Sequence, residues 1–198
     1  ITGDVKDLVI GIEEDYFFNN VDKDVEQAVR QQIQYLVDQG AKVETIKLPS
    51  LHNIEWAMLI TIISEASAIH HKNLQLRPQD FGDDVRFLLE LGELPSAVDF
   101  LHAQQIRQQI KQDFNNILSK VDVIISPTLP IVPNKIGNPL VDLNGEQVDL
   151  LDQLIRFTGA SNLTGLPALS IPAGFKNNLP VGMQIIGGAF QEGRILNV

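Results

Sequence analysis

Cysteine is absent from this 198-residue chain. Without thiols the chain can form no disulfide framework, no thiolate metal site and no cysteine nucleophile. No apolar run approaches the roughly 20 residues that a membrane-spanning helix requires, because Glu, His or Pro interrupts each candidate. The N-terminus also lacks the basic start and the small-residue cleavage site of a signal peptide. We therefore expect a cytoplasmic protein with no membrane partner.

Basic residues are also scarce. The chain carries 15 Lys and Arg against 25 Asp and Glu, which gives a formal net charge of −10, and it has no basic run. A nucleic-acid surface needs clustered cations that displace counterions from the phosphates. We therefore expect no nucleic-acid partner, and we interpret the acidic side chains as an ordinary solvated surface.

What the chain does contain is an alternation of strand and helix patterns. A β-branched run at 8–12 is followed by an amphipathic helical pattern at 22–39, with Asp22 as the N-cap and Gly40 just after its end. A pattern typical of a half-buried strand follows at 43–48. Strand, helix and strand in this order predict a βαβ unit. The fold class expected is therefore α/β, with a mixed, largely parallel sheet flanked by helices.

The rest of the chain continues the same pattern. Ser96 and Asp99 form a box-like cap at the start of the longest amphipathic stretch, whose buried stripe is Ala103, Ile106, Ile110, Phe114 and Ile117. The polar segment 131–148 is expected to be irregular. Further helices are predicted at 52–72, 80–92, 96–119 and 149–160, and further strands at 122–126, 168–172 and 182–186.

No complete catalytic or cofactor motif occurs in the chain. None of its serines lies in a Gly-x-Ser-x-Gly turn, and Ser126, at the end of a predicted central strand, is more simply explained as a hydroxyl bonded to backbone. His70, His71 and His102 lack the spacing of metal ligands. No glycine-rich loop follows the first strand, which argues against a dinucleotide. We expect no metal, no cofactor and no catalytic residue within the chain.

Two C-terminal stretches carry a resemblance to a known family. FTGASNLTGLPALSIPAGF, at 157–175, and LPVGMQIIGGAFQEGRIL, at 179–196, resemble the C-terminal signature of the amidase signature family. VDVIISPTLPIVP, at 121–133, agrees in order and content, and the similarity extends over essentially all 198 residues. The resemblance implies an α/β/α sandwich and the cleavage of amide bonds.

Members of that family use a serine nucleophile, a cis-serine bridge and a lysine base, all carried by a Gly/Ser-rich stretch in the N-terminal half. This sequence contains no such stretch. The resemblance therefore implies that residues 1–198 are the C-terminal portion of a single amidase domain that lacks the N-terminal catalytic half. Such a portion is expected to be inactive alone, to line the substrate pocket, and to have that N-terminal half as its partner. Apolar surface left exposed without it would favour a homodimer.

The substrate class follows from one position in the resemblance. The glutamine-using branch, the A subunit of glutamyl-tRNA(Gln) amidotransferase, has an Asp seven residues before the Asn of its NL-x-GLP motif, and this chain has Ile155 there. An apolar side chain cannot pair with the ammonium of glutamine, and burying that charge unpaired costs several kcal/mol. The interpretation is a general amidase that acts on a small, more apolar amide. The alternatives are a non-catalytic α/β binding or scaffold module and that A subunit.

Five residues are expected to border the acyl site of such an amidase. Thr128 is nominated because ligands bind at the carboxyl ends of strands in open α/β sheets. The others are nominated by their position in the resemblance: Ile155, Thr158, Gly159 and Asn162.

Overall fold

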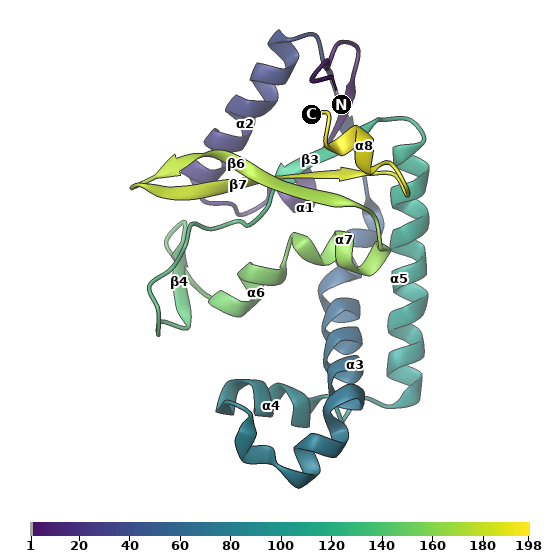
Figure 1. Ribbon diagram of the computed structural model, residues 1–198, viewed down its shortest axis with the longest axis vertical. Helices are drawn as coiled ribbons and strands as arrows, with labels where there is room; N and C mark the ends of the chain where they lie inside the picture. The colour runs from purple at the N-terminus through teal and green to yellow at the C-terminus, as the bar shows by residue number, and fades with distance from the viewer. Residues whose placement is uncertain (1) are drawn as a thin grey trace.

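The computed structural model describes residues 2–198 and is built on a five-stranded sheet with the strand order β2-β1-β3-β7-β6 (Figure 1). β1 pairs in parallel with β2 and β3, whereas β7 pairs antiparallel with β3 and β6. The prediction of a mixed sheet with flanking helices is confirmed, and parallel pairing is confined to the first three strands. The five strands are Val9–Glu13 (β1), Lys42–Ile46 (β2), Val123–Pro127 (β3), Ala168–Lys176 (β6) and Leu179–Gly187 (β7).

The helices fall into two groups (Figure 1). One group lies close to the sheet: α1 (Glu14–Phe17), α2 (Lys23–Asp38), α6 (Leu150–Ile155), α7 (Thr158–Thr164) and α8 (Glu192–Ile195). The other extends away from it: α3 (Ile54–Leu76), α4 (Asp83–Leu91) and α5 (Ala97–Leu118), with the short 3-10 turn η2 (Pro78–Asp80). A second 3-10 turn, η1 (Pro49–Asn53), leads from β2 into α3. Within residues 2–198, no helix has both the length and the apolar character needed to cross a membrane.

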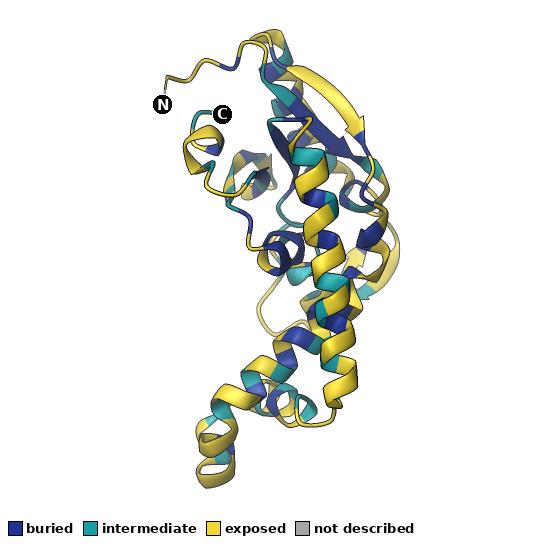
Figure 2. Ribbon diagram, turned by 90° about the vertical axis from the view of Figure 1, so that its right-hand side faces the viewer, coloured by how far each residue is buried: buried dark blue, intermediate teal, exposed yellow. Residues whose placement is uncertain are grey.

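The core is formed by the sheet together with α2 and the near ends of α3 and α5. All five residues of β3 are buried, as expected of a central strand. The predicted stripe of α5 is confirmed, since Ala103, Ile110 and Phe114 are fully buried and Ile106 and Ile117 pack against the same core. The far ends of α3 and α5, together with α4, are largely exposed (Figure 2).

The helix ends follow the expected local chemistry. The Asp22 side chain accepts hydrogen bonds from the backbone amides of Asp24 and Val25, and Gly40 has a φ of +103° just beyond the end of α2. Ser96 and Asp99 form a complete capping box at the start of α5. These caps were predictable because each involves only residues within a few positions of one another.

Three local expectations were wrong. β2 is not half-buried: four of its five residues are exposed because it forms an edge of the sheet. The segment 131–148 is not wholly irregular, since it contains an antiparallel hairpin of β4 (Leu140–Leu143) and β5 (Glu146–Asp149). The Asn144-Gly145 pair turns the chain there with positive φ at both residues, a preference of two-residue hairpin loops. The single helix expected at 149–160 is divided into α6 and α7 at Arg156 and Phe157.

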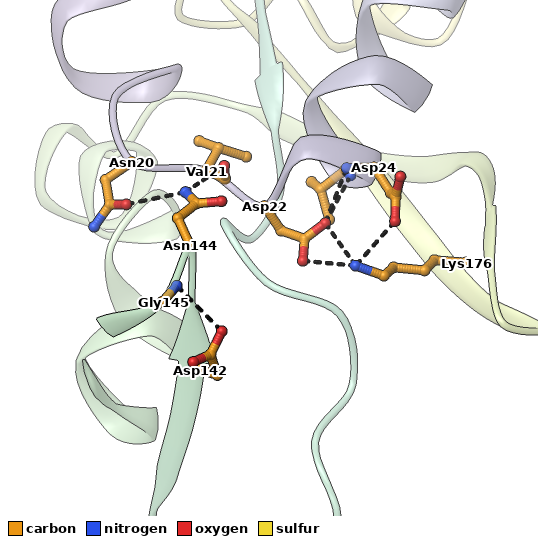
Figure 3. A network of polar contacts seen from close by, with 9 residues as sticks. Asn20, Val21, Asp22, Asp24, Asp142, Asn144, Gly145 and Lys176 are labelled. Atoms are coloured by element: carbon orange, nitrogen blue, oxygen red, sulfur yellow. Dashed lines mark hydrogen bonds and ion pairs between the residues drawn. The ribbon is translucent and has the colours of Figure 1, made fainter. Parts of the chain in front are cut away.

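A partly buried ion pair joins the β6–β7 hairpin to the start of α2 (Figure 3). The Lys176 ammonium lies 2.8 Å from Asp22 Oδ2 and 3.0 Å from Asp24 Oδ2. Burial alone would raise the pKa of the Asp22 carboxyl, but the bond from Lys176 and the backbone amides of Asp24 and Val25 hold that pKa below its ordinary value. The same bond to Asp22 raises the pKa of Lys176.

Lys176→Met should lower the free energy of unfolding by about 1 kcal/mol at pH 7, since only a quarter of the Lys176 side chain is exposed. A carboxyl whose pKa falls on folding stabilises the protein above its unfolded pKa of about 3.9, and that contribution is lost as the pH falls through the folded-state pKa. The difference between the two proteins should therefore shrink below about pH 3.9. Urea unfolding at pH 7, 5 and 3 measures it.

Lys42→Met is the matched control, because Lys42 pairs with Asp7 through side chains that are both about two-thirds exposed. The urea midpoint of the Lys42→Met variant should match that of the unaltered chain at every pH. A Lys176→Met difference that stays constant down to the lowest pH would show that the lost stability comes from packing and not from the ion pair.

Candidate functional site

A cavity of about 490 Å³ opens between the loop that follows α1, the first turns of α3, and α6. Its volume is within the range of small-molecule sites, about 300–1,000 Å³. One part of the wall is apolar and the other carries polar and charged side chains. The lining residues are Asn19, Asn20, Glu55, Trp56, Met58, Leu59, Asp152, Gln153, Ile155 and Arg156.

Arg156 fixes one wall of this cavity. Its guanidinium donates to the backbone carbonyls of Asn20, at 3.3 Å, and Asn19, at 3.0 Å, so that it ties α6 to the loop after α1. The guanidinium also lies over the Phe157 ring, 4.9 Å from the centroid. Its third nitrogen, Nε, is buried and has no hydrogen-bond partner. The charge of Arg156 is thus engaged by the protein, while one N–H donor is left over.

Tyr16 supports the same wall from behind. Its hydroxyl donates to the Arg156 carbonyl oxygen at 2.6 Å, and its ring meets the Phe157 ring edge-on at 5.7 Å. Burial and the nearby Glu55 carboxylate raise the pKa of Tyr16, against the opposing effect of Arg156. The phenol therefore stays protonated at neutral pH, as its role as a donor requires.

Gln153 is the exceptional residue of the cavity. It is only 9% exposed, and its carbonyl oxygen Oε1 has no hydrogen-bond partner. Leu151 and Leu154, on the same helix, are 47% and 42% exposed. α6 therefore turns a glutamine inward and leucines outward, the reverse of the usual helix pattern. A buried acceptor without a partner costs about 1–3 kcal/mol, and places where a sequence breaks local rules are expected at functional sites.

The structure places four of the five predicted site residues around the α6–α7 bend. Ile155 lines the cavity. Thr158 donates through its hydroxyl to the Ile155 carbonyl oxygen at 3.3 Å, so that its side chain also satisfies local backbone. Gly159 is buried, and a Cβ added there would lie 2.1 Å from Met58 Sδ, so this glycine allows α7 to approach α3 closely. Asn162 is exposed.

Thr128 lies apart from this group. It lines a second cavity of about 340 Å³ between the end of β3 and the β6–β7 hairpin, where its hydroxyl lies 2.6 Å from Ser170 Oγ. Ser126 is fully buried, donates to the Pro127 carbonyl oxygen and accepts from Gln184 Nε2 at 3.2 Å. Ser126 therefore has the backbone-bonding role that the sequence favoured.

The histidines take part in ordinary helix contacts. His71 Nδ1 lies 2.9 Å from Glu93 Oε1, and the His70 ring meets the Phe81 ring edge-on. Among the residues that the structure describes, no three His, Asp or Glu side chains are grouped so that they could hold a metal ion.

Sequence reasoning missed most of the cavity. Gln153 and Arg156 stand beside Ile155 in the chain, but nothing in the local pattern says which face of α6 points inward. The rest of the wall comes from two other segments, one with Asn19 and one with Glu55 and Trp56. These segments lie more than 30 positions from each other and from α6, so only the fold brings them together.

Comparison with known proteins gives a consistent family. The family model described as Amidase matches residues 2–196. A protein named amidase from Pseudomonas putida is 37% identical over 175 residues, which cover 88% of this chain and 38% of that protein. The A subunit of the glutamyl-tRNA(Gln) amidotransferase of Alcanivorax borkumensis is 36% identical over 220 residues, covering 98% of this chain and 44% of that protein.

Solved structures agree with these sequences. A crystal structure of an amidase superposes with a TM-score of 0.91 at 25% identity and covers 97% of this chain and 44% of that chain. The A subunit of the glutamyl-tRNA(Gln) amidotransferase of Thermotoga maritima superposes with a TM-score of 0.72 at 28% identity and covers 100% of this chain and 42% of that one. The chain thus spans less than half the length of each of these four proteins.

Proposed function

Because this chain belongs to the amidase family, we propose that it forms the C-terminal part of an enzyme that hydrolyses carboxylic amides to an acid and ammonia or an amine. The observation that carries the proposal is the alignment with the Pseudomonas putida amidase, which takes in 88% of this chain but 38% of that protein. The proposal assigns the Ser-cisSer-Lys triad to an upstream half of the same polypeptide. This chain contributes the wall of the substrate pocket and needs no cofactor.

The cavity beside Ile155 supports the pocket-lining role. Ile155, Trp56, Met58 and Leu59 give it an apolar side, which suits the acyl part of a small amide. Thr158 and Gly159 hold the α6–α7 bend from which Ile155 projects. Thr128, in the second cavity, would border the site from the end of β3.

Exposed apolar side chains give the proposed upstream half a surface to pack on. Ile69, Phe87, Leu94 and Val98, on and between the projecting helices, are between 63% and 77% exposed. Monomeric proteins seldom expose so many large apolar groups in one region. In the proposal this region is covered by the rest of the polypeptide or by a second copy in a homodimer.

A glutaminase is the second candidate, because several relatives are A subunits of the amidotransferase that are 32% to 36% identical to this chain. Ile155 cannot hold the ammonium of glutamine, but Glu55 and Asp152 line the same cavity and carry carboxylates. The two functions therefore differ in which substrate the cavity accepts. The third candidate function is a binding or scaffold module without any triad. In that case we expect no turnover at all.

The test compares this chain with the polypeptide that includes its upstream coding sequence. We expect the chain alone to release no product from an aryl amide, because it supplies neither nucleophile nor base. The longer polypeptide should hydrolyse that amide faster than glutamine and lose its activity to a serine-directed reagent.

Each of the other outcomes has a definite meaning. Turnover by the chain alone that survives repeated purification would refute the division of roles. Preference for glutamine would favour the glutaminase function, and an inactive longer polypeptide would favour the module. An upstream lysine followed by a Gly/Ser-rich run would support the amidase before any assay.

A further inference from the structure

We propose that the edge strand β2 pairs antiparallel with the same strand of a second copy of the chain, which joins the two five-stranded sheets into one. β2 lies at an edge of its sheet and pairs with β1 alone. An edge strand presents a row of unpaired backbone groups that another strand can use. This surface is separate from the projecting helices and from the cavity beside Ile155, so the inference does not depend on the proposed function.

The backbone of β2 determines which residues can bond across the new interface. The Lys42 amide donates to the Leu8 carbonyl oxygen at 2.7 Å, so the N–H and C=O groups of Lys42 face the β1 side. Successive residues of a strand direct these groups to alternate sides. The N–H and C=O groups of Val43 and Thr45 therefore point out of the edge of the sheet, where a second strand can meet them.

Charge selects one antiparallel register. When Val43 lies opposite Val43 of the second copy, these two residues exchange both backbone hydrogen bonds, and Lys42 lies opposite Glu44 of the second copy. By symmetry Glu44 lies opposite the other Lys42, so the interface contains two pairs of opposite charge. Such cross-strand pairs stabilise a sheet. Both pairs fall at non-hydrogen-bonded positions, where facing side chains approach each other most closely.

The same two side chains disfavour the neighbouring registers. A shift by one residue would turn the outward-facing backbone groups against groups that already face β1. A shift by two residues keeps the outward-facing groups together, but it places Glu44 opposite Glu44 in one direction and Lys42 opposite Lys42 in the other. Like charges directly opposite each other destabilise a sheet. The short sequence of β2 is therefore self-complementary in a single register.

The side chains of β2 are accessible to a second copy. Four of the five strand residues are exposed, and Val43 is 44% exposed. Lys42 pairs with Asp7 at the surface, and its ammonium has three donors, so it can bond Glu44 of the second copy as well. A cavity of about 590 Å³ between β2 and α2 is lined by Val43 and Thr45 on the strand side. The second Val43 would cover part of this cavity.

The association is expected to be weak. Strands of five residues bury less surface than the roughly 1,000 Å² of a stable interface. Each copy also carries a net charge of −10, which opposes any contact between copies. We expect a dissociation constant on the order of 10⁻⁴ M. The chain should therefore be a monomer when dilute and a dimer only at high concentration.

The experiment follows the self-association of the 198-residue chain by sedimentation equilibrium, with two-dimensional NMR to locate the contact. On concentration, the amide signals of residues 41–47 should shift. Glu44→Lys should weaken the association at least about fivefold, because both charge pairs become lysine against lysine. This substitution removes one negative charge and adds one positive charge, taking the net charge from −10 to −8. General repulsion alone would therefore predict a stronger association.

Two further variants identify the surface. Lys42→Glu combined with Glu44→Lys restores both pairs with the charges exchanged and keeps the net charge at −10, so the affinity should return to within about twofold of that of the unaltered chain. The lost contact with Asp7 is exposed and contributes little. Ile69→Ser alters a side chain of α3 that is 77% exposed, and should leave the association unchanged.

Each contrary result is specific. A chain that stays monomeric at millimolar concentration, or a Glu44→Lys variant that associates as well as the unaltered chain, would overturn the proposal. So would a double variant that keeps the folded NMR spectrum but does not associate. If Ile69→Ser abolishes the association and the shifted signals belong to α3 and α4, the projecting helices form the contact and β2 does not. None of these measurements involves turnover, so the amidase function is tested separately.

Discussion

Replacing Gly92 with alanine should lower the free energy of unfolding by about 3 kcal/mol. Gly92 follows the last residue of α4 and lies directly against α3. A Cβ at this position would lie 2.1 Å from the Ile63 carbonyl oxygen and 2.8 Å from Ser67 Cβ. The first contact is with backbone, so no side-chain rotation relieves it. α3 and α4 would have to separate.

The requirement for glycine here is one of space and not of backbone conformation. Gly92 has a φ of −68°, which any residue adopts, whereas Gly165, after α7, has a φ of +69°. The sequence identified Gly92 as a helix end, but only the contact with α3 reveals why this position must be glycine.

Gly193→Ala is the matched control for Gly92→Ala. Gly193 lies in α8, has no atom within 4 Å of an added Cβ, and has no positive φ. Alanine there should leave the stability unchanged or raise it by up to about 1 kcal/mol. Urea unfolding of both variants measures the contrast. If Gly92→Ala unfolds at the same urea concentration as Gly193→Ala, the close approach of α3 and α4 is not present in solution.

Much of the fold was predictable because its determinants are local in the sequence. The cap at Asp22, the capping box at Ser96 and the buried stripe of α5 each depend on residues within a few helical turns. The strand β3 was predictable because a short continuous run of β-branched residues is typical of a strand that is buried on both faces.

The errors arose where the answer depends on distant segments. β2 alternates like a half-buried strand, but its exposure is set by its place at the edge of the sheet. The division between α6 and α7 depends on Phe157, which enters an aromatic cluster with Tyr16 and Phe17 from the other end of the chain. The cavity depends on Arg156 holding the carbonyls of Asn19 and Asn20. No pattern within the segment 149–160 contains that information.

Phe157→Ala should therefore be as damaging as any single truncation in the chain, lowering the free energy of unfolding by about 3–5 kcal/mol. The Phe157 side chain is fully buried and meets the rings of Tyr16 and Phe17 edge-on, at 5.7 Å and 5.6 Å. Alanine would leave a cavity at the α6–α7 bend and remove the ring over which the Arg156 guanidinium lies.

Two further variants show whether the loss comes from this cluster. Phe157→Leu fills part of the space and should cost less than Phe157→Ala, because the cost grows with the volume left empty. Phe87→Ala truncates a phenylalanine of α4 that is 63% exposed, and should stay within about 0.5 kcal/mol of the unaltered chain. Equal stability of the two alanine variants would mean that the bend between α6 and α7 is not held by this aromatic cluster.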